Sequence, residues 1–172
     1  PVTLGWIGQS VNFKFLDGLD GVFHELNKFM NFNLLVVADK DFYSKNANVV
    51  NKRWSPDLEV SYILEMDIGL MPLEDSEWSR GKCAFKAIQY MAAGVPAVAS
   101  SVGANLELIS HRKNSYLAFD MQDWIESIKE LAESFELRNE IGKSSRASIE
   151  DRYSLNVVSA RLYDLFINLH KL

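Results

Sequence analysis

Short apolar segments alternate with segments of helical spacing along the whole chain, and this alternation limits the possible folds more than any other feature. The apolar segments that fit buried strands are residues 2–7, 33–38, 48–54, 68–71, 95–100 and 115–118. Helical spacing or a helix-start signal marks residues 15–30, 58–65, 82–93, 104–110, 121–134, 136–151 and 154–170. Strands that alternate with helices usually pair in parallel, with helices on both faces. The sequence therefore predicts an α/β fold with a doubly wound, Rossmann-like parallel sheet.

The loops that follow strands are where a ligand is expected in such a fold. Ligands of doubly wound sheets bind beyond the carboxyl ends of the strands, where the strand order reverses. Candidate site residues are therefore sought in the loops at residues 8–15, 72–82 and 101–105.

Length, charge and cysteine content exclude several classes of protein. The 172 residues suit one domain, and the formal net charge of −5 argues against a general nucleic-acid binder. The lone cysteine, Cys83, excludes an internal disulfide, and His24, His111 and His170 lack metal-ligand spacing. No apolar run approaches the roughly 20 residues that a membrane span needs. We expect a cytoplasmic protein that binds neither nucleic acid nor a dedicated metal ion.

The first of these loops begins with Gly8 and ends with Lys14. A glycine directly after a strand lets the backbone turn sharply and approach a ligand closely. Lys14 would stand at the start of the next helix, where it could reach a phosphate. The alternative is an ordinary strand-to-helix turn with a solvated lysine.

The second loop leads into a helix that carries two lysines. With the helix expected at residues 82–93, Lys82, Lys86 and Gln89 have the spacing of one helix face. Backbone amides at a helix N-terminus favour anions, so the amides from Gly81 to Phe85 would complete a diphosphate site. The alternative is an amphipathic helix whose basic face is solvated.

The third loop combines small residues with a carboxylate. Gly103 and its neighbours permit a close approach of the backbone, and Glu107 falls in the first turn of a short helix. A carboxylate in that turn is favoured by the helix dipole, so a structural role explains Glu107 as well as a catalytic one does. The dinucleotide, P-loop and nucleophile-elbow motifs are absent from the sequence.

The chain resembles the group 1 glycosyltransferases, glycosyltransferase family 4, whose members have the GT-B fold. The resemblance is most specific in the string Gly-Lys-Cys-Ala-Phe-Lys at residues 81–86 and in Gln-Tyr-Met-Ala-Ala-Gly-Val-Pro at residues 89–96. The loop at residues 8–14 matches the spacing of the element that opens the family's C-terminal domain. Residues 151–154, Asp-Arg-Tyr-Ser, are similar to the family's approach to its last helix.

The resemblance implies a single donor-binding domain over residues 1–172, the C-terminal half of a GT-B enzyme. Such an enzyme transfers a sugar from a nucleoside diphosphate sugar to an acceptor and keeps the anomeric configuration. The acceptor-binding N-terminal domain would lie outside this chain, and the acceptor, a glycan or a lipid-linked glycan, is left open. No cofactor is expected beside the donor. The inner membrane surface is a further expected location for the full-length protein.

The resemblance and the three loops together give the expected site. Lys14 and Lys86 are expected to be catalytic, because cations stabilise the charge that develops on the leaving diphosphate. The base is expected near the turn at residues 53–55. The residues expected to bind the donor are Gly8, Gln9, Lys14, Arg53, Trp54, Gly81, Lys82, Cys83, Ala84, Phe85, Lys86, Gln89 and Gly103.

The chain departs from the family pattern at three positions. The family's first-loop arginine falls on Gln9, which makes Lys86 a candidate replacement cation. The family's two glutamates, one beside the donor sugar and one on the ribose, fall on Gly81 and Gln89. Gln89 can still form hydrogen bonds with ribose hydroxyls, whereas Gly81 has no side chain.

These departures leave open which residue replaces the first glutamate and whether the protein is a transferase. Two upstream carboxylates are candidate replacements for the first glutamate, namely Glu74 and Glu77. A nucleotide-sugar-binding module that has lost catalysis is the main alternative function. An epimerase of GT-B architecture is a second alternative, although its histidine and glutamate motifs are not found.

Overall fold

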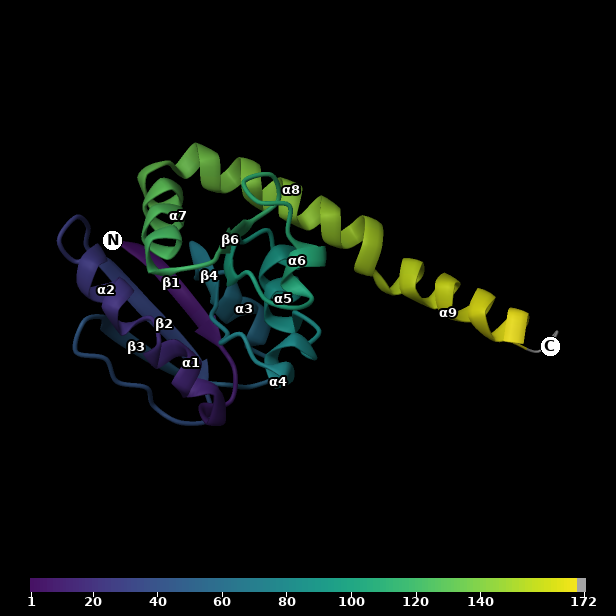
Figure 1. The fold of residues 1–172 in the computed structure, drawn as a ribbon, viewed down its shortest axis with the longest axis horizontal. Coiled ribbons are helices and arrows are strands. Elements are labelled where there is room, and N and C mark those ends of the chain that lie inside the picture. Colours follow the sequence, from purple (N-terminus) through teal and green to yellow (C-terminus); the bar gives the residue numbers. More distant parts are fainter. Residues whose placement is uncertain (170–172) are drawn as a thin grey trace.

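Six parallel strands form one sheet in the computed structural model, which describes residues 1–169 (Figure 1). The strands are β1 (Val2–Ile7), β2 (Phe32–Ala38), β3 (Asn48–Arg53), β4 (Ile68–Met71), β5 (Ala97–Ser100) and β6 (Tyr116–Ala118). Their order is β3-β2-β1-β4-β5-β6, and neighbouring strands pair in parallel. The order reverses between β1 and β4, which makes this the switch point of the sheet. The predicted fold class is confirmed.

Helices cover both faces of this sheet. One core layer packs α1, α2 and α7 on the sheet, the other packs α3, α5 and α6, and α8 contributes to both. The helices are the 3-10 helix η1 (Ser10–Asn12), α1 (Phe13–Asp17), α2 (Asp20–Leu26), α3 (Glu59–Ile63), α4 (Glu77–Arg80), α5 (Phe85–Ala92), α6 (Asn105–Leu108), α7 (Met121–Glu133), α8 (Phe135–Tyr153) and α9 (Leu155–Leu169).

Strand β1 shows why the apolar segments become central strands. Leu4 and Trp6 point into one core layer and Ile7 into the other, and all three side chains are buried. Full burial of each such side chain stabilises the fold by about 1.5–3 kcal/mol. Gly5 is required between them, because a Cβ there would lie 2.1 Å from the sulfur of Met66.

Tyr90 of α5 fills the gap where β1 and β4 separate. The two strands pair as far as Gly5 and Gly69, and a Cβ on Gly69 would lie 2.4 Å from the Tyr90 ring. Beyond that point the Ile7 amide donates to the Tyr90 hydroxyl (3.0 Å), which in turn donates to the Leu70 carbonyl (3.3 Å). Burial raises the pKa of Tyr90, so the phenol keeps its proton. The side chain therefore anchors α5 in the switch point.

The helix predicted over residues 15–30 is wrong as a single helix. The structure places η1, α1 and α2 there instead; α1 ends at Asp17, with Gly18 as its C-cap. The apolar residues of the segment are nevertheless buried, since Leu16, Leu19, Phe23 and Leu26 all belong to one core layer. Their spacing thus indicated the buried face correctly but did not indicate the break.

The start of the helix predicted over residues 82–93 is also wrong. Ala84 has a left-handed backbone (φ 56°), so α5 begins only at Phe85. Part of the preceding segment, expected to be a loop, forms α4, whose N-cap Ser76 accepts a hydrogen bond from the Ser79 amide. The helix expected at residues 58–65 is shorter, and the remaining elements lie near their expected bounds.

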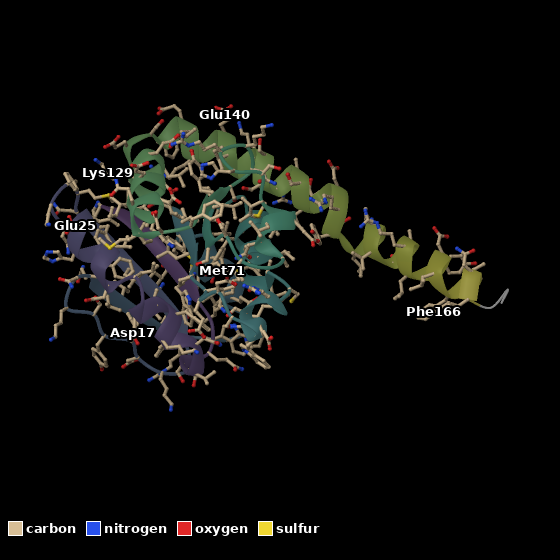
Figure 2. The ribbon with its side chains drawn as sticks, viewed as in Figure 1. Asp17, Glu25, Met71, Lys129, Glu140 and Phe166 are labelled. Carbon is tan, nitrogen blue, oxygen red and sulfur yellow. The ribbon has the colours of Figure 1, made fainter. Side chains whose placement is uncertain are left out.

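The last helix extends away from the rest of the chain (Figure 1). None of its described residues is buried, and apolar side chains such as Leu155 and Leu162 are exposed. Phe166 is exposed as well (Figure 2). The predicted helix over residues 154–170 is confirmed as far as Leu169, whereas position 170, with His170, lies outside the described residues. Within residues 1–169, no helix has both the length and the apolar character that crossing a membrane requires.

Candidate functional site

An open cavity of about 710 Å³ lies at the carboxyl ends of β1, β2 and β3, beside α5. This is the edge of the sheet at which doubly wound folds bind their ligands. Its polar lining comes from segments that are distant in the sequence: Gln9, Ser10, Asn12, Asp39, Glu59, Lys86 and Gln89. The indole of Trp54 and the ring of Phe85 add apolar surface.

A second cavity of about 560 Å³ adjoins the first. Residues of the loop after β1 and of the start of α5, including Gln9 and Lys86, line both. The second cavity also contains Lys14 and Lys82, so three lysines meet there. We call the two cavities together the groove; it has a basic end and an end near Trp54.

Lys86, in the first turn of α5, is the charged side chain among those that line both cavities. Its ammonium lies 5.3 Å from the centroid of the Trp6 ring. Burial lowers the pKa of Lys86 from 10.5 to about 8, and the neighbouring charge of Lys82 adds to this effect. Within residues 1–169, Lys86 forms no ion pair with a carboxylate. A desolvated cation without a counter-ion is well prepared to bind an anion.

Gly8 provides the space that Lys86 occupies. A Cβ on Gly8 would lie 2.7 Å from Cε of Lys86 and 2.7 Å from the Trp6 ring. The glycine after the first strand thus permits a close approach, as expected. What approaches it in this structure is a lysine side chain from α5.

Lys14 and Lys82 stand at the basic end of the groove in different surroundings. Lys14, in α1, is exposed and forms an ion pair with Glu74 at 2.8 Å. The Lys82 ammonium lies 3.5 Å from Oδ1 of Asn12 and 4.2 Å from the centroid of the Phe15 ring. Burial lowers the pKa of Lys82; the charge of Lys14 lowers it further, and that of Glu74 opposes the change. Lys14 is therefore already neutralised in part, whereas Lys82 is not.

The expectation that Lys82, Lys86 and Gln89 share one helix face is wrong. Lys82 precedes α5, because the left-handed turn at Ala84 separates it from the helix. Lys82 and Lys86 nevertheless meet in the second cavity, while Gln89 lies one turn further along α5, in the first cavity. The grouping was correct for the two lysines, although its helical explanation was not.

At the other end of the groove, hydrogen bonds connect the side chains of Trp54, Glu59 and Gln89. Glu59, in the first turn of α3, accepts a hydrogen bond from Nε1 of Trp54 at 2.6 Å. Its other carboxylate oxygen accepts one from Nε2 of Gln89, also at 2.6 Å. The predicted residues Trp54 and Gln89 are therefore connected through a glutamate.

Asp39 fixes the loop after β1 to the end of β2. Its two oxygens accept hydrogen bonds from the amide (2.6 Å) and the hydroxyl (2.9 Å) of Ser10. These bonds lower the pKa of Asp39. The predicted Arg53 lies beside this contact, where it donates to the Asp39 carbonyl and pairs with Asp41 at 3.3 Å. Arg53 therefore supports the rim rather than lining the groove.

The other predicted residues lie near the start of α5, with one exception. Gly81, Cys83 and Phe85 line the second cavity, and Ala84 is buried behind them. Gly103 instead packs against α4, since a Cβ there would lie 2.7 Å from a backbone oxygen of that helix. The role of these residues in donor binding stays a prediction.

Two carboxylates of the groove were missed by sequence reasoning. Asp39 directly follows the strand 33–38, a position that could have been found from the rule for strand ends. Glu59 lies in a first helical turn, where a carboxylate has an ordinary structural explanation. Of the two suggested replacement glutamates, Glu74 pairs with Lys14, and Glu77 lies in the first turn of α4.

Comparisons with known proteins place the chain among glycosyltransferases. Residues 2–134 match the family model described as Glycosyl transferases group 1. Spore coat protein SA of Bacillus subtilis (strain 168) is 34% identical over 79 residues, which are 44% of this chain and 21% of that protein. The matched part thus spans about a fifth of that relative.

Solved structures with a similar fold include an isolated glycosyl transferase domain and chains about twice as long as this one. The C-terminal domain of LpcC, a glycosyl transferase group 1 family protein from Francisella tularensis, has a TM-score of 0.68 at 17% identity, over 90% of this chain and 87% of that one. Anabaena Alr3699/HepE, solved in complex with UDP and glucose, has a TM-score of 0.75 at 14% identity, over 96% of this chain and 48% of that one. The fold is thus that of a GT-B C-terminal domain. Since the family model matches most of its length, the chain belongs to the group 1 glycosyl transferases.

Proposed function

We propose that the chain is the donor-binding domain of a retaining glycosyltransferase that uses a nucleoside diphosphate sugar. The observation that carries this proposal is the groove, in which Lys14, Lys82 and Lys86 meet at one end and Trp54 lies at the other. A nucleoside diphosphate has the matching pattern of a charged diphosphate and a planar base. Anabaena HepE, which has the same fold, was solved in complex with UDP-glucose, and this supports a nucleotide sugar as the ligand class.

The basic end of the groove suits the chemistry of the leaving group. When the bond between the sugar and the diphosphate breaks, negative charge develops on the terminal phosphate of the departing nucleoside diphosphate. A preorganised cation in a partly dehydrated site stabilises such charge more strongly than one in water. Lys86 meets this description, and Lys82 and Lys14 add charge beside it.

We expect donor binding without a metal ion or a further cofactor. In the part of the chain that the structure describes, no group of three or more histidine, cysteine, aspartate or glutamate side chains is arranged to hold a metal ion. The lysines offer the positive charge that a divalent ion supplies in other phosphate sites.

An acceptor-binding domain is proposed to form the opposite wall of the groove. The chain covers only 48% of HepE. Apolar side chains are exposed around the second cavity, at Val11, Trp78 and Phe85, and along α9. Exposed apolar surfaces of this kind commonly mark contacts with another domain or protein. This chain alone should therefore bind the donor but not transfer the sugar.

A module that binds nucleotide sugars without catalysis is the second candidate. Gly81 favours it, because the position that carries a glutamate in the resembling family has no side chain here. Incubating the donor with the protein that carries both domains separates the two functions. Release or transfer of the sugar identifies an enzyme, whereas donor binding without turnover identifies a module.

Calorimetry tests donor binding by this chain. UDP, GDP and ADP are titrated in the presence of EDTA and compared with the corresponding nucleosides. We expect one diphosphate to bind, and its nucleoside to bind at least about ten-fold more weakly, because the lysines contact the diphosphate. Equal affinities for nucleoside and diphosphate, or binding that requires Mg²⁺, would contradict the proposal.

A further inference from the structure

Glu59 lines the first cavity, at the end of the groove near Trp54 and away from Lys14 and Lys82. It lies in α3, and its carboxylate joins Trp54, just after β3, to Gln89 of α5, with both hydrogen bonds at 2.6 Å. Within residues 1–169 it forms no ion pair with a lysine, arginine or histidine. Its charge is therefore available to a ligand in the first cavity, which it lines.

The two hydrogen bonds that Glu59 accepts determine which polar groups nearby remain free to bind a ligand. A carboxylate accepts hydrogen bonds and donates none, so the amide nitrogen of Gln89 must face Glu59 and its Oε1 must point elsewhere. The two bonds use about half of the roughly four acceptor positions of the carboxylate. The indole N–H of Trp54 is engaged as well. This end of the groove consequently presents hydrogen-bond acceptors to a ligand.

A surface of acceptors selects a ligand group that donates. A phosphate would be repelled by the Glu59 carboxylate, and a cation would be repelled by Lys86 in the same cavity. Neutral hydroxyl groups donate without either conflict. Two neighbouring hydroxyls can bond to the two oxygens of one carboxylate. An acidic side chain accepts a hydrogen bond from the ribose 2′-hydroxyl in dinucleotide sites.

We propose that Glu59 is a specificity-determining residue whose carboxylate accepts hydrogen bonds from the 2′- and 3′-hydroxyls of the donor's ribose. Gln89 assists through Oε1, and the exposed ring of Trp54 faces the base. Trp54 is bonded to Glu59 and Glu59 to Gln89, which lies one turn along α5 from Lys86, so base, ribose and phosphates would follow the same sequence of contacts. This inference rests on the proposed function, because a ribose reaches the groove only as part of a nucleotide.

Asp39 is the other carboxylate that lines the first cavity, and it provides a matched control. Both of its oxygens are held by Ser10 of the neighbouring loop, at 2.6 and 2.9 Å. Its donors belong to one loop residue, whereas those of Glu59 come from two walls of the groove. Asp39 is therefore assigned to holding the loop after β1.

The test compares a nucleoside diphosphate with its 2′-deoxy form. The probe is the member of UDP, GDP and ADP that binds best to the wild-type chain. We expect the wild type to prefer the ribose form by about ten-fold, the value of one hydrogen bond to a charged group. Glu59→Gln should bring the two affinities close together, mainly by weakening the ribose form, whereas Asp39→Asn should preserve the preference.

The outcomes separate this inference from the proposed function. If Glu59→Gln weakens both nucleotides equally and keeps their ratio, Glu59 only positions Trp54 and Gln89, and the inference is overturned while donor binding stands. Loss of the ratio in Asp39→Asn but not in Glu59→Gln would assign the ribose to Asp39 instead. Failure of all three diphosphates to bind the wild type would overturn the proposed function itself. If Glu59→Gln does not fold, Glu59→Asp, which withdraws the carboxylate by one methylene, gives the same comparison.

Discussion

Replacing Lys86 with methionine should stabilise the fold and weaken diphosphate binding, two effects of opposite sign. Methionine keeps an unbranched stem that can pack on Trp6 but has no charge to desolvate. If Lys86 contacts the diphosphate, its loss removes a charge-assisted contact of roughly 1.5–3 kcal/mol, about ten- to a hundred-fold in affinity. The affinity for the nucleoside should stay unchanged, because it has no diphosphate for Lys86 to contact.

The gain in stability follows from the pKa of Lys86. Its fall from 10.5 to about 8 means that the folded state carries the charge at a cost of roughly 3 kcal/mol near neutral pH. The Trp6 ring beside the ammonium offsets about 0.5–2 kcal/mol of this cost. The net gain in the free energy of unfolding should be about 1–3 kcal/mol, and each kcal/mol raises Tm by about 2–4 °C in a domain of this size.

The difference in the free energy of unfolding between Lys86→Met and the wild type should decrease as the pH rises. Between about pH 8 and pH 10.5 the unfolded wild type keeps the Lys86 proton while the folded state loses it, so wild-type stability rises with pH. The methionine variant lacks this contribution. Its advantage should therefore be full below about pH 8 and disappear as pH rises towards 10.5.

Urea unfolding at about pH 7 and about pH 10, together with calorimetric titration of the diphosphate, measures both effects. The control is Lys14→Met, which removes an exposed lysine paired with Glu74 and should change stability by no more than about 0.5 kcal/mol. Equal stability of wild type and Lys86→Met at pH 7 would refute the desolvated cation. Unchanged diphosphate affinity would refute the placement of the phosphates beside α5.

Three further predictions concern the groove and the chain as a whole. Gly8→Ala should weaken diphosphate binding several-fold without removing a charge, because its Cβ would displace Lys86; calorimetry would show this, and an unchanged affinity would mean that the lysine adapts freely. Gln89→Glu should lower the unfolding midpoint at about pH 7, because it replaces the amide that donates to Glu59 with a second carboxylate at hydrogen-bond distance; an unchanged midpoint in urea unfolding would contradict the contact. The chain alone should transfer no sugar from UDP-glucose to water or to added acceptors, and measurable transfer would show that the acceptor domain is not needed.

The sheet could be predicted from the sequence because its signals are local. Runs such as residues 33–38 are apolar throughout, which is what burial on both faces of a parallel sheet requires. The left-handed turn at Ala84 could not be predicted in this way, because alanine rarely adopts that conformation. The start of α5 was consequently placed too early.

The site was predicted in part, for a related reason. Gly8 and the lysines could be proposed from the sequence, because each stands in a loop after a strand or near the start of a helix. The resemblance to the family pointed to the segment at residues 81–96. The environment of Lys86 depends on Trp6 and Gly8 of a distant strand, and the role of Gln89 depends on Glu59, thirty positions away. Contacts between residues so far apart in the sequence depend on how the helices pack on the sheet, and a local sequence pattern does not reveal that packing.

The anchoring of α5 by Tyr90 makes the two walls of the groove unequal in local stability. The α5 wall is tied into the centre of the sheet through a fully buried side chain, so its amides should exchange with solvent only when much of the domain opens. The wall with Trp54 and Glu59 follows the edge strand β3, in which no residue is buried, and it should open through smaller and more frequent fluctuations. A ligand that bridges both walls must therefore immobilise the edge, and part of its binding free energy is used in that ordering. Substitutions on β3 that do not contact the ligand can then change its affinity, because they change how mobile this edge is before the ligand binds and hence the free-energy cost of immobilising it.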